Sequence, residues 1–170
     1  ALVASLVLEG INFYSGFAFF YNLARNQKML KTSTMISYIN KDELCHSYFI
    51  SQLVRAVLWE NPHLDEDGSF SVWIYDYIDE AIRYETEWSR FVLRDIDGID
   101  VIEMEKYIEY LGNKRLRMLG LEDRYDADEN AMPWIRAFSD ENVNLGKTDF
   151  FEARPRSYTK TTDINGFDEL

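Results

Sequence analysis

Cysteine, proline and glycine are all scarce in this sequence, which has one, three and eight of them among 170 residues. A single cysteine cannot close an internal disulfide, so a disulfide-stapled secreted domain is excluded and a reducing, cytoplasmic compartment is expected. The proline and glycine residues lie mostly outside the long periodic stretches, and this distribution favours long helices.

Positive charge is also in short supply, with 18 Lys and Arg against 30 Asp and Glu and a formal net charge of -12. A surface this acidic repels phosphate backbones, which excludes general nucleic-acid binding. No long apolar run is free of charge, because the most apolar stretch, residues 1–24, carries Glu9 near its centre and has no basic leader. We therefore expect neither a membrane span nor a signal peptide. An apolar content of 46% predicts a folded domain.

Apolar periodicity predicts an all-α domain over residues 1–145, and we see no strand pattern. The predicted helices cover residues 2–24, 33–59, 70–93 and 101–119, with Asp100 as the N-cap of the last. The apolar stripe of the second helix is expected to be buried and consists of Met35, Ile39, Ile50, Leu53 and Val57. The aromatic residues of the third helix are also expected in the core: Trp73, Tyr77, Tyr84, Trp88 and Phe91. Residues 146–170 are expected to form an extended tail that orders only against a partner.

Three ionisable residues interrupt the apolar stripes of the first two predicted helices. Glu9 lies three residues after Leu6 and four before Phe13, and Glu43 and His46 lie on the stripe of the second helix. Burying a lone carboxylate costs at least several kcal/mol, so such groups shift their pKa, form ion pairs or bind a metal. Few Lys or Arg lie on these faces, which favours a metal.

The spacing of these residues agrees with a metal site. Glu43-x-x-His46 places a carboxylate and an imidazole one turn apart, and ferritin-like di-metal bundles combine two such pairs with a lone Glu from each of two other helices. One lone Glu and one pair are half of that set, and a mixed oxygen and nitrogen shell suits iron or manganese. The alternative is a chance spacing in which Arg25 or another chain neutralises the acids.

The same residues resemble a known family, the small (β, radical-generating) subunit of class I ribonucleotide reductase. The resemblance is carried by residues 8–17 (LEGINFYSGF), 24–27 (ARNQ) and 39–46 (INKDELCH). Residues 147–158 (KTDFFEARPRSY) are similar to the C-terminal region of that subunit. Family members have chains about twice as long, so this chain resembles the C-terminal half of one, as a natural split product or a cleaved piece.

The resemblance implies a role for each matching position. Glu9, Glu43 and His46 match three ligands of a dinuclear iron and/or manganese site, with Glu43 bridging. Phe13, Phe17 and Ile39 match the apolar pocket around the radical. Asp42, Glu152 and Tyr158 match residues of the radical-transfer route. Phe167 and Leu170 match the peptide that docks on the large subunit.

The resemblance also implies an activity and partners. The dioxygen-activated site would start the reduction of ribonucleotides to deoxyribonucleotides in the large subunit. The expected partners are an N-terminal half with the remaining ligands, the large subunit, and a second small subunit in a dimer. Two alternatives stay open: another ferritin-like di-metal oxidase or oxygenase, and a metal-free helical partner protein.

Overall fold

The computed structural model of the protein describes residues 1–127, 130–135 and 138. Within these residues every regular element is helical, which confirms the all-α prediction. The predicted tail, residues 146–170, lies outside the described residues. So do four predicted functional residues: Glu152, Tyr158, Phe167 and Leu170.

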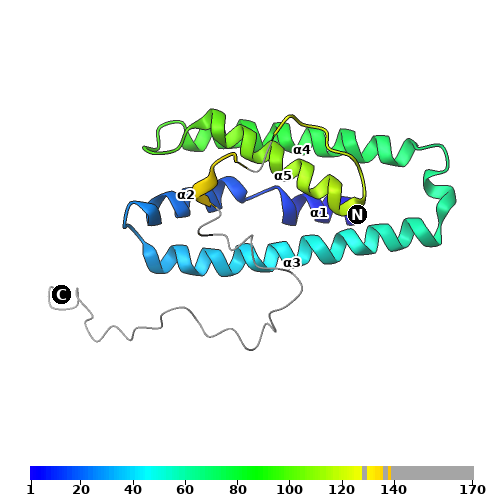
Figure 1. Ribbon diagram of the computed structural model, residues 1–170, viewed down its shortest axis with the longest axis horizontal. Coiled ribbons are helices and arrows are strands. Elements are labelled where there is room, and N and C mark those ends of the chain that lie inside the picture. Colours follow the sequence, from blue (N-terminus) through cyan, green and yellow to red (C-terminus); the bar gives the residue numbers. More distant parts are fainter. Residues whose placement is uncertain (128–129, 136–137, 139–170) are drawn as a thin grey trace.

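Five α-helices form one bundle (Figure 1). They are α1 (Leu2–Gly10), α2 (Tyr14–Arg25), α3 (Leu30–Glu60), α4 (Ser69–Leu93) and α5 (Val101–Leu119), with short 3₁₀ turns at Pro62–Asp65 and Pro133–Ile135. Helices α1 and α2 follow one another along α3 on one side, and α4 packs on α5 on the other. The buried core therefore lies mainly where α1, α2, α4 and α5 meet.

The helix ends follow local chemistry closely. Asp100 caps α5 as predicted, because its Oδ1 accepts from the backbone N–H groups of Ile102 and Glu103 at 2.7 and 3.3 Å. Gly120 ends the same helix with a left-handed φ of 83°, a conformation that glycine adopts without strain. The predicted bounds of α3, α4 and α5 are confirmed to within three residues.

The single helix predicted over residues 2–24 is wrong, because the chain breaks between Gly10 and Tyr14. Phe13 takes a left-handed φ of 72°, which no α-helix accommodates. The segment Leu2–Arg25 is long enough for a membrane span, and the mean hydropathy of its most apolar window, 1.4, is that of one. Half of its most apolar window is nevertheless buried inside the chain's own bundle, as in the core helix of a folded domain.

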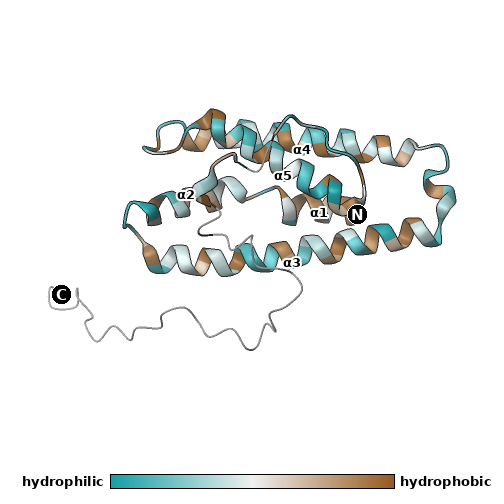
Figure 2. Cartoon of the chain, in the orientation of Figure 1, coloured by the Kyte–Doolittle hydropathy of each residue, from teal (hydrophilic) through white to brown (hydrophobic). Residues whose placement is uncertain are grey.

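The prediction that the apolar stripe of the second helix is buried is also wrong. The buried residues of α3 are mostly small and polar: Ser33, Asn40, Ser47, Ser51 and Val54. The stripe lies on a different side, where Met35 is 60% exposed and Ile39 is 44% exposed, and only Ile50 packs against the core. Apolar residues recur along α3 (Figure 2), and many of its large ones lie outside the side that the chain's other helices cover.

The aromatics of α4 depart from the prediction in the same way. Trp73, Tyr84, Trp88 and Phe91 are 44–67% exposed, and Tyr77 is half-buried. Trp73 stacks on Phe70 and Tyr77 along the outside of the helix. The core side of α4 is instead formed by aliphatic residues such as Ile74 and Ile78, so the outward aromatics form a second apolar surface that no other described part of the chain covers.

Candidate metal centre

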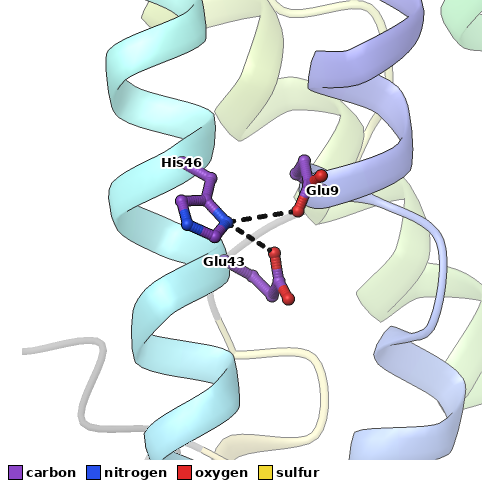
Figure 3. A group of neighbouring side chains, drawn as sticks. All are labelled: Glu9, Glu43 and His46. Carbon is purple, nitrogen blue, oxygen red and sulfur yellow. Dashed lines mark hydrogen bonds and ion pairs between the residues drawn. The ribbon is translucent and has the colours of Figure 1, made fainter.

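Glu9, Glu43 and His46 come together where α1 lies beside α3 (Figure 3). Glu9 is in the last turn of α1, and the other two are one turn apart on α3. His46 Nδ1 lies 3.1 Å from Glu43 Oε2 and 3.3 Å from Glu9 Oε2, and one ligand atom from each residue lies within 4.8 Å of the others. Residues 34 positions apart in sequence thus converge on a volume that one metal ion could occupy.

The cluster is less buried than the sequence predicts. The side chains of Glu9 and Glu43 are 29% and 20% exposed, and that of His46 is 57% exposed. Among the described residues, no helix covers the side of α3 on which His46 lies, so this chain closes the cluster on one side only. The centre therefore has a closed side formed by α1 and α3 and an open side.

The three groups shift one another's pKa values. Hydrogen bonding from Glu43, with further help from His46, lowers the pKa of Glu9. The pKa of Glu43 is raised, first by desolvation and then by its hydrogen bond to Glu9. Hydrogen bonds to Glu43 and Glu9 raise the pKa of His46, because both carboxylates favour the imidazolium form. Two carboxylates held this close require a proton or a cation between them.

The contacts of the three residues favour a bound metal ion over neutralisation of the two carboxylates by Arg25. Among the described residues, His46 is the recorded ion-pair partner of both Glu9 and Glu43. Arg25 is engaged elsewhere, since it donates to the side chain of Asn22 and the carbonyl of Gly98 and lies over the Trp134 ring. Two carboxylates and one imidazole form the mixed oxygen and nitrogen shell that suits iron or manganese.

No second group of three ligand-type side chains converges within the described part of the chain, so a dinuclear site would need ligands from elsewhere. Asp42, the predicted radical-transfer acid, is exposed on α3 next to Glu43. The ligand and relay roles of these residues stay predictions.

The predicted radical pocket is only partly assembled. Phe13 and Phe17 line an open groove of about 470 Å³ between α2 and α4, whose other walls include Phe20, Tyr84 and Trp88. Phe17 is buried, whereas Phe13 is 59% exposed, and Ile39 does not line the groove. Within the described part of the chain the groove is open on one side, and the role of the three residues around a radical stays a prediction.

Two charged residues near the centre were missed by the sequence reasoning. Arg115 on α5 is fully buried, and Glu85 on α4 is 6% exposed. Each lies in an apolar row of its helix, Arg115 four residues before Leu119 and Glu85 three after Ile82. The rule that singled out Glu9, an ionisable group inside an apolar stripe, finds both of them when it is applied to the later helices.

The fold and the site together define a helical bundle that carries a carboxylate and imidazole cluster on two neighbouring helices. The family model described as "Ribonucleotide reductase, small chain" matches residues 1–133. The chain belongs to this family, and the resemblance noted in the sequence is confirmed.

Individual relatives agree with the family model. A ribonucleoside-diphosphate reductase subunit beta from Halalkalibacterium halodurans is 47% identical, over all of this chain and 49% of that protein. The subunit beta from Treponema pallidum is 39% identical over 94% of this chain and 46% of that protein. The solved ribonucleotide reductase R2 subunit from Clostridium botulinum has a TM-score of 0.77 at 37% identity, covering 82% of this chain and 44% of that one. The ferritin-like fold is thereby confirmed, and the chain spans about half the length of the relatives it matches.

Proposed function

We propose that this chain is the C-terminal part of the radical-generating small subunit of a class I ribonucleotide reductase. The observation that carries the proposal is the convergence of Glu9, Glu43 and His46 at a centre with one open side. The complete centre, with two iron or manganese ions, would use dioxygen to supply the one-electron oxidant that ribonucleotide reduction requires. The relatives are named for ribonucleoside diphosphates, and we assign that substrate class to the assembled enzyme.

The chain's own residues would hold one side of this centre. Glu9, Glu43 and His46 would supply two carboxylates and an imidazole as ligands, and the resemblance assigns to Glu43 the role of the ligand shared by both ions. Their carboxylates offset metal charge in a site of low dielectric constant. Phe13, Phe17 and Ile39 form one wall of an apolar pocket that keeps water and reductants from the radical once the open side is covered.

The remaining ligands would come from the other half of the subunit. The uncovered side of α3 carries His46 together with exposed apolar residues, among them Met35, Ile39 and Phe49. Apolar surface beside an incomplete metal centre is suited to a helix that brings further carboxylate and imidazole ligands. Covering this surface would complete both the centre and the bundle, and two complete subunits would form the dimer.

The C-terminal residues would connect the centre to the large subunit in the cytoplasm. Tyr158 can lose an electron and a proton together, so it suits a relay between two proteins, and Asp42 and Glu152 are the acids of the same route. Phe167 and Leu170 would anchor the tail on the large subunit. The resemblance of residues 147–158 to the C-terminal region of that subunit supports the assignments of Glu152 and Tyr158.

Metal content tests the centre directly. In the protein purified with any polypeptide that accompanies it, His46→Ala is expected to lose bound iron or manganese, measured by elemental analysis. His63→Ala is the matched control, because His63 is the other histidine of the chain and is exposed in a 3₁₀ turn. Equal metal content in His46→Ala and wild type would contradict the proposal and leave the metal-free helical partner as the function.

The tail is tested separately from the metal. Tyr158→Phe is expected to abolish deoxynucleotide formation with the large subunit while metal content stays unchanged, and Tyr38→Phe, an exposed tyrosine of α3, is expected to have no effect. Retained turnover in Tyr158→Phe would remove this residue from the relay. Binding of the large subunit that does not depend on residues 147–170 would favour an oxidase acting within its own bundle.

A further inference from the structure

The break between α1 and α2 begins two residues after Glu9 and is held from two sides by buried ionisable side chains. Arg115 reaches the last residue of α1, and Glu85 reaches the first turn of α2. Neither residue belongs to the metal ligands or to the relay, so their burial calls for another explanation.

Arg115 satisfies the C-terminal end of α1. Its Nε donates to the carbonyl oxygen of Gly10 at 2.8 Å, and its terminal nitrogen donates to the hydroxyl of Tyr14 at 2.9 Å across the break. The last carbonyls of a helix lack partners within the helix and carry partial negative charge, which a guanidinium complements. Arg115 forms no recorded ion pair with an acid in the described part of the chain, so the helix end serves as its counter-charge.

Glu85 acts in the same way on the N-terminal end of α2. Its Oε1 accepts from the backbone N–H of Ser15 at 3.3 Å and from the Ser15 hydroxyl. The N–H groups of a first turn are likewise unpaired within the helix. The two contacts fix the helices on either side of Phe13, whose left-handed backbone is unfavourable for a side chain of this size.

Gly10 is the point at which Arg115 and α3 both approach α1. A Cβ atom at this position would lie 2.4 Å from Arg115 Nε and 3.1 Å from the Oγ of Ser47, the neighbour of His46. Glycine therefore lets α5 and α3 close on the backbone directly beside Glu9. The distance between α1 and α3 at this point therefore also affects the distance from the Glu9 carboxylate to Glu43 and His46.

We propose that Arg115 is a positioning residue for the metal centre. By fixing the carbonyl of Gly10, it sets the position of the Glu9 carboxylate relative to the two ligands on α3. This inference rests on the proposed function, in which Glu9 is a ligand, and assigns to Arg115 no contact with the metal.

The test compares Mn²⁺ affinity with local backbone protection in the full protein, together with any polypeptide that co-purifies. Arg115→Met keeps the length of the side chain and removes its donors, and Gly10→Ala displaces the guanidinium with a single methyl group. Both variants are expected to weaken Mn²⁺ binding at least tenfold, measured by electron paramagnetic resonance of free Mn²⁺. Arg115→Lys, which retains one donor for the Gly10 carbonyl, is expected to recover part of that affinity.

A matched control separates positioning from general stability. Asn113 is also fully buried on α5, but it binds the backbone of residues 124–125 instead of the break. Asn113→Ala is expected to lower the melting temperature. It is expected to leave the Mn²⁺ affinity within about twofold of wild type, because Asn113 shares no partner with the metal centre. In metal-free protein, hydrogen exchange over residues 10–15 is expected to accelerate in Arg115→Met and not in Asn113→Ala.

The two hypotheses fail in different ways. If wild-type protein binds Mn²⁺ no better than Glu9→Ala, the proposed function fails, and the exchange experiment still tests the contact of Arg115 with the break. Unchanged Mn²⁺ affinity in both Arg115→Met and Gly10→Ala would overturn the positioning role. An equal loss of affinity in Asn113→Ala would also overturn it, because affinity would then follow stability alone.

Discussion

Replacement of Phe49 by Asp tests whether the uncovered side of α3 is an interface with the missing half of the subunit. Phe49 is one turn beyond His46 and is 63% exposed, so the chain's own fold makes little use of its ring. The substitution is therefore expected to leave the free energy of unfolding of this part nearly unchanged while it weakens association with the other half.

The exposed fraction sets the size of the effect. A phenylalanine buries about 200 Å² when it is fully covered, so a partner would cover about 120 Å² more at this position. At ~25 cal/mol per Å² this is worth about 3 kcal/mol. Loss of that contribution raises the dissociation constant by about 100-fold. This figure is a lower bound, because burying the unpaired Asp carboxylate costs further free energy.

The assay is isothermal titration of the purified chain with the polypeptide that supplies the missing half. Ile102→Asp is the matched control, because Ile102 is 64% exposed but lies on α5, away from the metal centre. The reasoning is refuted if Phe49→Asp binds with wild-type affinity, or if Ile102→Asp loses as much affinity.

Three further predictions concern stability. Burial raises the pKa of Glu85 above 4.5, the value of a free glutamate, so the unfolded chain loses this proton first as pH rises. The contribution of Glu85 to the free energy of unfolding therefore falls from pH 4.5 up to the raised pKa and is constant above it. In urea unfolding, Glu85→Gln should lack this fall. Parallel pH profiles of wild type and Glu85→Gln would disprove the assignment. Phe13→Gly should stabilise the fold by about 1 kcal/mol in the same assay, since glycine accepts the φ of 72° without strain, and a net loss would show that the ring's contacts outweigh the strain. Asn113→Ala should cost about 3 kcal/mol, because the side chain makes three hydrogen bonds of 2.8–3.0 Å to the backbone of residues 124–125, and a loss below 1 kcal/mol would mean that water replaces them.

Features that depend on neighbouring residues in the chain could be predicted from the sequence. The N-cap at Asp100 and the end of α5 at Gly120 follow from local hydrogen bonding and backbone conformation. The pairing of Glu43 with His46 follows from helical geometry, since residues three apart share a face. Glu9 was singled out as an ionisable group in an apolar stripe, although its distance from the α3 pair was not a local property.

Which apolar surfaces are buried was decided by tertiary structure. Apolar periodicity indicates that a helix has a side to bury, but α4 has two apolar sides, and the covered side of α3 is mostly small and polar. Only the packing of this chain determines which side is covered. Residues such as Met35 and Trp88 therefore looked like core residues and are exposed.

By itself, the amino-acid sequence determined α3, α4 and α5 with their approximate ends, and the kinds of side chain available for a metal, because these depend on contacts within a few residues. The break after Gly10 was decided only by tertiary structure, since it is stabilised by Arg115 from 105 residues away and by Glu85 from 70 residues beyond Ser15. The same packing placed Glu9 beside Glu43 and His46, because the distance between two helices depends on all the side chains between them.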